Sequence, residues 1–267
     1  MDEFQNDFSK ITLVAIQAAL KAGEILKSGF RSEFKIDKKE GKHNLVTEYD
    51  LLSETNIIAF IKERFPDHSI LCEEEGLFNK KSEYKWIIDP LDGTVNFAHS
   101  IPMFAVNIAV SKNDEIISGV TYHPLINELF IAEKGKGAFL NGKKLKVTNT
   151  KKLDDAILAT GFPYDLSKNP NQCIERFINI LKLGIPVRRI GAASLDLAYV
   201  AAGRFDVFWE TGLGPWDCAA GILLIEEAGG KITNYDGSKI TTLQNKNAII
   251  ASNTHLHEEF FKQIKNV

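Results

Sequence analysis

An apolar run in the first half of the chain ends in two aspartates that stand three residues apart. The segment reads Trp86-Ile87-Ile88-Asp89-Pro90-Leu91-Asp92-Gly93-Thr94. Its apolar residues predict a buried strand that delivers Asp89, and Pro90 predicts a turn directly after it. Such a turn can point both carboxylates at one cation. Gly93 permits a tight backbone conformation, and Thr94 can cap a short helix whose free amides suit a phosphate group.

Carboxylate oxygens of this kind favour hard divalent cations, Mg²⁺ or Mn²⁺, over softer metals. The six histidines and three cysteines are scattered and offer no competing metal site. Asp, Pro, Gly and Thr are also the usual residues of a surface turn. On this segment alone the metal site and the surface turn are about equally supported, so other acidic residues must decide between them.

Helix and strand signals alternate around this segment without internal repeats. The first half predicts a helix from about residue 8 to a stop at Gly29, a helix over 47–64, and strands over 69–72, 85–88, 104–111, 115–122 and 129–132. The second half predicts strand 156–160, helix 172–183, strand 187–190, helix 194–203, strand 206–210 and helix 216–228. This alternation is typical of α/β layering. We expect an N-terminal α+β lobe over residues 1–152, with most metal ligands, and a C-terminal α/β lobe over residues 153–267, in one compact functional unit.

Composition excludes several classes of protein. The 267 residues carry 32 basic and 35 acidic side chains, a formal net charge of −3, without a basic tail or stripe. Duplex nucleic acid is therefore not expected as a ligand. The first residues are polar and acidic and no apolar run is long enough to cross a bilayer, so we expect a cytoplasmic protein without membrane contact. Three scattered cysteines predict free thiols.

Three further acidic residues lie at predicted element boundaries, and each also has a purely structural interpretation. Thr47 and Asp50 have the spacing of a helix cap with its first-turn acid. Glu73 follows the predicted strand 69–72, but a run of three glutamates is more typical of a solvated loop. Asp217 stands where a helix begins, and the helix dipole stabilises an acid there.

Taken in order, these residues resemble the inositol monophosphatase family of metal-dependent, lithium-sensitive phosphatases. The matching blocks are Leu45-Val46-Thr47-Glu48-Tyr49-Asp50, Glu73-Glu74, residues 86–97, Gly135-Lys136-Gly137-Ala138-Phe139, and Pro215-Trp216-Asp217 with Glu226 and Ala228-Gly229-Gly230. The similarity covers nearly the whole chain. It implies the layered α-β-α-β-α sandwich of the inositol monophosphatase and fructose-1,6-bisphosphatase type, usually as a homodimer.

The resemblance also implies metal ligands. Glu73, Asp89 and the carbonyl of Leu91 would hold one Mg²⁺, and Asp89, Asp92 and Asp217 would hold a second, so that Asp89 bridges the two. A third, weaker ion near Glu73 is implied as well, and Mn²⁺ can substitute for Mg²⁺.

The catalytic residues that the resemblance implies are Asp50, Thr94 and Glu73. Thr94 and Asp50 would orient and deprotonate the attacking water, and the cations would neutralise charge on the phosphoryl group during in-line displacement. No covalent phosphoenzyme is needed.

Substrate contacts follow from the same resemblance. They are Asp92, Gly93, Thr94 and Asp217 near the phosphate, and Gly191, Ala192, Ala193 and Glu210 near the ring hydroxyls. Helix packing for residues 191–193 and a surface strand end for Glu210 remain open as alternatives. The basic segment 35–42 implies an active-site lysine, for which we choose Lys39 over its close rivals Lys38 and Lys42.

We therefore expect Mg²⁺-dependent hydrolysis of a small phosphorylated polyol or sugar, with inositol 1-phosphate as the first choice. Ala192 and Gly214-Pro215 depart from the animal enzymes and leave other substrates open, whereas Asn96-Phe97 favours a polyol over a nucleotide. The alternatives are fructose 1,6-bisphosphate, a nucleotide 3′-phosphate and histidinol phosphate. A different alternative is a phosphatase-fold protein that acts mainly as a binding or regulatory partner, although the intact acidic set argues against it.

Overall fold

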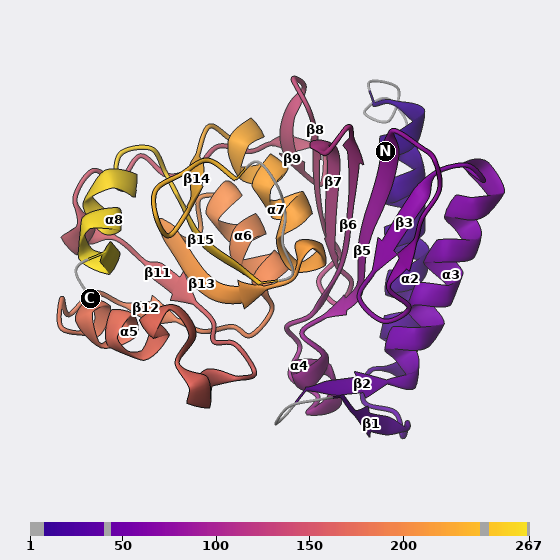
Figure 1. Cartoon of the computed structure of the whole chain (residues 1–267), viewed down its shortest axis with the longest axis horizontal. Coiled ribbons are helices and arrows are strands. Elements are labelled where there is room, and N and C mark those ends of the chain that lie inside the picture. Colours follow the sequence, from indigo (N-terminus) through magenta and orange to yellow (C-terminus); the bar gives the residue numbers. More distant parts are fainter. Residues whose placement is uncertain (1–7, 40–43, 241–245, 266–267) are drawn as a thin grey trace.

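Helices and strands of the computed structural model form five layers in the order α-β-α-β-α (Figure 1). The structure describes residues 8–39, 44–240 and 246–265. An eight-stranded sheet and a five-stranded sheet lie on either side of a central helical layer, and further helices cover the outer face of each sheet. The expected layered sandwich is therefore confirmed.

The larger sheet has the strand order β10-β9-β8-β7-β6-β5-β3-β4. All its neighbouring strands are antiparallel except β3 and β5, which are parallel. Its strands are β3 (Ser69–Cys72), β4 (Leu77–Phe78), β5 (Tyr84–Asp92), β6 (Ala105–Lys112), β7 (Glu115–His123), β8 (Glu128–Glu133), β9 (Gly137–Leu140) and β10 (Lys143–Lys144).

Two helices, α2 (Lys10–Gly29) and α3 (Glu48–Arg64), cover the outer face of this sheet. Ser9 caps α2 by accepting a hydrogen bond from the amide of Thr12. A hairpin of β1 (Ile36–Lys38) and β2 (Leu45–Thr47) leads into α3. The short helix α4 (Thr94–Ala98) follows β5 directly, so the end of this strand lies beside the β1–β2 hairpin.

The smaller sheet has the order β12-β11-β13-β15-β14. Its strands are β11 (Leu158–Thr160), β12 (Val187–Arg188), β13 (Val207–Leu213), β14 (Lys231–Asn234) and β15 (Asn247–Ser252). Helices α5 (Cys173–Leu181) and α8 (His257–Lys265) lie on its outer side, and α6 (Ala193–Ala201) and α7 (Pro215–Glu227) form the central layer. Three short 3₁₀ turns complete the described elements, at Leu153–Asp155, Leu166–Lys168 and Pro170–Gln172.

The central helices explain why the two sheets pack as one body. Every residue of α6 is buried and most of α7 is buried, because both helices are apolar on nearly all sides. One apolar core lies between the larger sheet and α2 and α3, a second surrounds α6 and α7, and a third lies under α5 and α8. Helix α7 follows residue 152 in the chain, but it packs on the larger sheet, whose strands all precede residue 152. The boundary between two lobes at residue 152 therefore stays a prediction.

Strand β5 corrects the expected turn at Pro90. The strand continues to Asp92, and its pairing with β6 runs from Asp89 opposite Asn107 to Asp92 opposite Ala105, which leaves one extra residue in β5. This is a β-bulge, and Pro90 is tolerated in it because a bulged position has no ladder hydrogen bond to donate. In a regular strand, side chains three positions apart face opposite sides. The bulge therefore brings the two carboxylates to the same side.

Candidate active site

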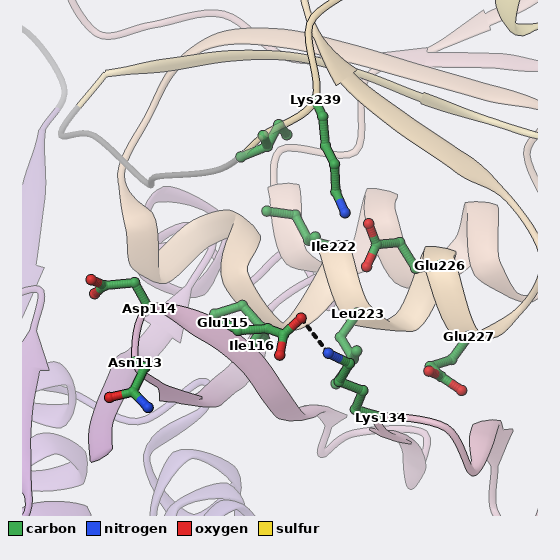
Figure 2. A pocket seen from close by; sticks show the side chains of 11 residues that line it. Asn113, Asp114, Glu115, Ile116, Lys134, Ile222, Leu223, Glu226, Glu227 and Lys239 are labelled. Carbon is green, nitrogen blue, oxygen red and sulfur yellow. Dashed lines mark ion pairs between the residues drawn. The ribbon is translucent and has the colours of Figure 1, made fainter. Parts of the chain in front are cut away.

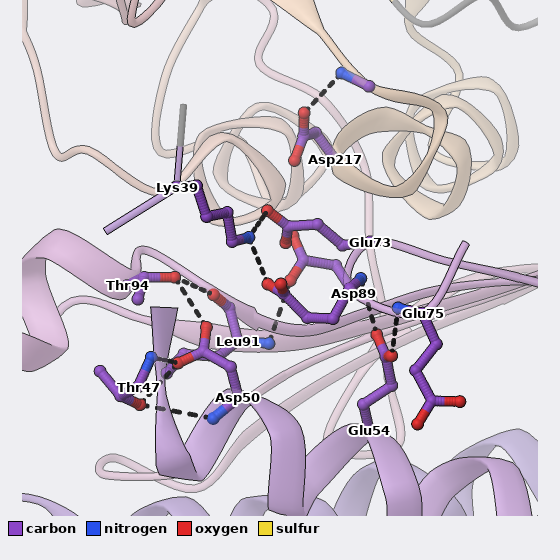
Figure 3. Close-up of polar contacts among 12 residues, drawn as sticks. Lys39, Thr47, Asp50, Glu54, Glu73, Glu75, Asp89, Leu91, Thr94 and Asp217 are labelled. Atoms are coloured by element: carbon purple, nitrogen blue, oxygen red, sulfur yellow. Dashed lines mark hydrogen bonds and ion pairs between the residues drawn. The ribbon is translucent and has the colours of Figure 1, made fainter. Parts of the chain in front are cut away.

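Three aspartates converge at the end of β5, and their ligand oxygens lie within 4.8 Å of one another. Asp89 and Asp92 come from the bulge, and Asp217 comes from the first turn of α7. Figure 3 shows Asp89 and Asp217 with their neighbours. They lie in a hollow of about 190 Å³. Its lining is Asn44, Glu73, Asp89, Leu91, Asp92, Gly93, Thr94, Tyr164, Gly212, Gly214, Trp216 and Asp217.

Burial and crowding raise the pKa values of all three aspartates. Burial is the largest cause for Asp89, and the negative charges of Glu73, Asp92 and Asp217 add to it. Burial also raises the pKa of Asp92 to about 6, although hydrogen bonds from Ser194 oppose the rise. The pKa of Asp217 is raised well above its ordinary value for the same reason. A divalent cation would relieve this repulsion, so the all-oxygen donor set fits a hard metal ion.

Asp217 is held in place by both halves of the chain. Its carboxylate accepts a hydrogen bond of 2.6 Å from the amide of Gly214, which fixes the start of α7. The buried side chain of Asn107 on β6 donates at 2.6 Å to the carbonyl of Trp216. Thr121 in turn donates to the Asn107 amide oxygen at 2.7 Å. Sequence reasoning missed Asn107, whose only signal was a polar residue inside an apolar strand.

Asp50 and Thr94 meet beside the aspartates. The Thr94 hydroxyl lies 3.0 Å from Asp50 Oδ1 and 3.0 Å from the carbonyl of Leu91. Asp50 Oδ2 accepts hydrogen bonds from the amide and the hydroxyl of Thr47, at 2.7 Å and 2.6 Å. The predicted helix cap is thus present, and it uses one carboxylate oxygen while the other faces Thr94. Burial raises the pKa of Asp50 to about 6.

Gly93, not Thr94, caps helix α4, which corrects the expectation that Thr94 would be the cap. Gly93 has a φ of 89°, and a Cβ there would lie 2.8 Å from the carbonyl oxygen of Met103. Only glycine fits this position without strain. Thr94 is consequently the first helical residue, and its hydroxyl is directed to Asp50 and Leu91.

Glu73 lines the hollow but lies outside the group of three aspartates. Its carboxylate pairs with Lys39 Nζ at 3.0 Å, and the same ammonium contacts Glu74. Of the three candidate lysines, Lys39 reaches the site, Lys38 is exposed in β1, and Lys42 lies outside the described residues.

The turn that presents Glu73 rests on a residue that sequence reasoning missed. Glu54, a buried side chain of α3, accepts hydrogen bonds from the amides of Glu74 and Glu75 at 3.0 Å and 2.8 Å. The sequence could have indicated Glu54 through its helical spacing, which places it on the buried face of α3 with Asp50, Ile57 and Ile61.

The expected substrate contacts divide into two groups. Asp92, Gly93, Thr94 and Asp217 line the hollow, whereas Gly191, Ala192, Ala193 and Glu210 are absent from its lining. Ala192 is buried in a small apolar cluster with Leu195, which agrees with helix packing of its side chain. The amide of Ser194, two residues after Ala192, donates to Asp92 at 2.8 Å, so the start of α6 orients that aspartate.

Glu210 lies inside a strand, and the expectation that it stands at a strand end is wrong. Strand β13 continues to Leu213, and Glu210 pairs within it opposite Ile249. Its carboxylate lies against Gly161, where a Cβ would come within 2.1 Å of it. Burial and then the charge of Asp92 raise the pKa of Glu210 to about 8.

A larger hollow of about 320 Å³ lies between α7 and the β6–β7 turn (Figure 2). Its charged groups are mostly engaged within the protein. Glu115 pairs with Lys134, and Glu227 accepts hydrogen bonds from the amides of Gly135 and Gly137, both at 2.7 Å. No metal-type cluster of acidic side chains lies there among the residues that the structure describes. The smaller hollow is therefore the candidate active site.

The five-layer fold and its acidic hollow, with a threonine–aspartate pair beside three aspartates, define a layered α/β protein with an all-oxygen site that fits a divalent cation. Comparison with known proteins names the family. A model of the inositol monophosphatase family matches residues 7–267, and the chain belongs to this family.

Individual relatives agree with this assignment. The inositol-1-monophosphatase of Caulobacter vibrioides is 45% identical over 94% of this chain and 99% of that protein. The Nus factor SuhB of Pseudomonas aeruginosa is 43% identical over 90% of each chain. The crystal structure of the extragenic suppressor protein suhB from Bartonella henselae superposes with a TM-score of 0.90 at 38% identity, over 97% of this chain and 99% of the other.

No helix among the described residues combines the length and the apolar character that a membrane span requires.

Proposed function

We propose that the chain hydrolyses a small phosphomonoester in a Mg²⁺-dependent reaction, with inositol 1-phosphate as the substrate. The observation that carries the proposal is the convergence of Asp89, Asp92 and Asp217 beside the Thr94–Asp50 pair. Mg²⁺ suits this donor set because all its ligand atoms are oxygens, and Mn²⁺ would substitute for it. Asp89, Asp92 and Asp217 would hold one ion, and Glu73, Asp89 and the Leu91 carbonyl another; a third would bind near Glu73. When bound, these ions lower the pKa of a water molecule and neutralise charge on the phosphoryl oxygens.

The protein's own residues account for water activation. The single hydroxyl proton of Thr94 can serve only one of its two acceptors at a time, Asp50 Oδ1 or the Leu91 carbonyl. With the proton directed to Asp50, a lone pair of the Thr94 oxygen is free to accept a hydrogen bond from water. As the water loses its proton to the Thr94 oxygen, the hydroxyl proton of Thr94 would pass to the Asp50 carboxylate. The Thr47 hydrogen bonds fix the Asp50 carboxylate, so the pair is positioned before substrate binds. Glu73 lies at the same hollow and would orient the water from its other side.

Substrate contacts are assigned to the hollow and to a group of residues beyond its lining. Asp92, Gly93, Thr94 and Asp217 would contact the phosphate and its leaving oxygen. The backbone of residues 191–193 and the Glu210 carboxylate would contact ring hydroxyls only if the ligand reaches beyond the described lining. Fructose 1,6-bisphosphate, a nucleotide 3′-phosphate and histidinol phosphate are alternative substrates under the same chemistry.

Phosphate release from a panel of these monoesters tests the proposal. We expect release that requires Mg²⁺, is inhibited by Li⁺ and ranks inositol 1-phosphate first. The Asp217→Asn variant should lose release while its circular dichroism spectrum is unchanged. If the wild-type protein with Mg²⁺ releases no phosphate from any ester, the proposal is wrong.

A second function is favoured by the names of the relatives. The Pseudomonas aeruginosa protein is a Nus factor, so this chain can also serve as a regulatory partner. Affinity capture with an active wild-type protein and with Asp217→Asn would separate the two roles, because binding should survive the substitution.

The proposal also includes the oligomeric state and the location of the protein. We propose a homodimer of two cytoplasmic copies, each with two lobes divided near residue 152. Analytical ultracentrifugation tests the dimer.

A further inference from the structure

We propose that Tyr164 is a substrate-contacting residue that lines the active-site hollow and recognises the hydroxylated part of a polyol monophosphate. This inference rests on the proposed function and extends it to the choice of leaving group.

The position of Tyr164 supports a contact role. It lines the same hollow as Glu73, Asp89 and Asp217, yet it comes from the loop after β11, in the other sheet. Its side chain is 53% exposed. A tyrosine that serves the core would be covered, so the exposed ring at this hollow is available to a ligand.

Tyr164 differs from the other tyrosines that the structure describes. Tyr49, Tyr84 and Tyr199 pack against aromatic rings, and Tyr122 donates a hydrogen bond to Asn127 at 3.0 Å. Tyr235 packs against the core under α5 and α8, with the Arg176 guanidinium over its ring. Among the described residues, Tyr164 has no hydrogen bond and no ring contact. Its packing therefore gives no structural reason for an aromatic residue at the mouth of the site.

The loop that carries Tyr164 is held close to β13 by two glycines. A Cβ on Gly161 would lie 2.1 Å from the Glu210 carboxylate. Gly212 has a φ of 88°, stands at the register shift of β13, and a Cβ there would lie 2.7 Å from Pro163 Cβ. Both approaches require the absence of a side chain, so they fix the segment on which Tyr164 stands.

An ion pair holds the other side of this segment. Asp165, the residue after Tyr164, lies 2.9 Å from Lys246 at the start of the chain into β15. The backbone segment that carries Tyr164 therefore has contacts on both sides, with β13 and with Lys246.

The chemistry of the phenol determines what it can recognise. A tyrosine hydroxyl is neutral at pH 7 and can donate one hydrogen bond and accept another. The ring face offers an apolar surface to the C–H groups of a sugar or polyol. A phosphate group belongs with the cations that the three aspartates would hold. Tyr164 is therefore suited to the leaving alcohol rather than the phosphate.

Calorimetric binding tests this assignment without relying on turnover. The protein is titrated with inositol 1-phosphate, and separately with inorganic phosphate, in Ca²⁺ in place of Mg²⁺. We expect Tyr164→Phe to raise the Kd for inositol 1-phosphate about 3–10-fold, as for the loss of one hydrogen bond. Tyr164→Ala should raise it more than tenfold, and the Kd for phosphate should change less than twofold in both.

The matched control is Tyr84→Phe, at the far end of β5, which should leave both affinities unchanged. The inference is overturned if both Tyr164 variants bind inositol 1-phosphate as the wild type does, or if phosphate binding weakens equally. A wild-type protein that binds inositol 1-phosphate no better than phosphate, or that binds neither, also overturns it. Failure of the proposed function is seen separately, as absence of phosphate release by the wild type from 4-nitrophenyl phosphate in Mg²⁺.

Discussion

The replacement Asp92→Asn should stabilise the metal-free protein while it removes activity. Asp92 is buried among like charges, and its carboxylate is therefore costly when no cation is present. Asparagine keeps an oxygen that can accept the hydrogen bond of the Ser194 amide, so the local geometry is preserved.

The magnitude follows from the pKa of Asp92, which is raised from an ordinary 3.8 to about 6. A rise of this size corresponds to roughly 3 kcal/mol against the charged carboxylate at neutral pH. Because the pKa of Asp92 is higher in the folded state, protonated Asp92 stabilises the fold relative to charged Asp92. This stabilisation is complete below pH 3.8 and is lost as the pH rises through 6. For a chain of this length, roughly 3 kcal/mol corresponds to an upper limit of about 6–12 °C in Tm.

Thermal unfolding followed by circular dichroism measures this effect. In EDTA at pH 7.5, Asp92→Asn should have a higher Tm than the wild type, and the difference should vanish near pH 4. In Mg²⁺ the Tm of the wild type should rise, because an ion concentration of 100 times the Kd adds about 2.7 kcal/mol to the free energy of unfolding. The Tm of the variant should rise much less. Asp114→Asn, an exposed aspartate in a surface pair with Lys85, is the matched control and should change little.

Two results would refute the reasoning. A lower Tm of the metal-free Asp92→Asn protein at pH 7.5 would show that the carboxylate stabilises the fold. An equal Mg²⁺-induced gain in both proteins would show that Asp92 is not a ligand.

Three further predictions follow from other contacts of the site. Thr94→Val, which removes the hydroxyl and keeps the shape, should lower kcat by about 10²–10⁴-fold with an unchanged calorimetric Mg²⁺ affinity; a loss of less than tenfold would contradict its role in water activation. Lys39→Met should strengthen Mn²⁺ binding several-fold, because the ammonium competes for Glu73; weaker binding by titration would show that the lysine assists the ion. Asn107→Ala should destabilise the protein by about 1–3 kcal/mol in urea unfolding, since it removes the donor to the Trp216 carbonyl and leaves the buried Thr121 hydroxyl without its acceptor; a stability equal to the wild type would rule out this link between β6 and α7.

Local signals in the sequence predicted much of the fold and the position of the acidic groups. The cap formed by Thr47 and Asp50 and the apolar run before Asp89 depend on neighbouring residues, and both are present. The order of the five layers followed from the family resemblance, because strand order across a sheet is not encoded in local spacing.

Contacts between distant segments could not be predicted. The bulge in β5 depends on its pairing with β6, so the sequence of β5 alone suggested a turn at Pro90. The hydrogen bond from Ser194 to Asp92 spans 102 residues, and Glu54 supports Glu73 through backbone amides 20 and 21 residues away. Such contacts depend on tertiary packing rather than on residue type.

The bulge also has a consequence for tolerance to changes in chain length. A strand that gained or lost one residue between Asp89 and Asp92 would turn one of the two carboxylates toward the opposite face of the sheet, into the apolar core. The β6–β7 turn at Asn113 and Asp114, in contrast, is exposed and can change length at little cost. Within these three neighbouring strands of the larger sheet, insertions should therefore be acceptable in the β6–β7 turn and should abolish metal binding in the β5 bulge.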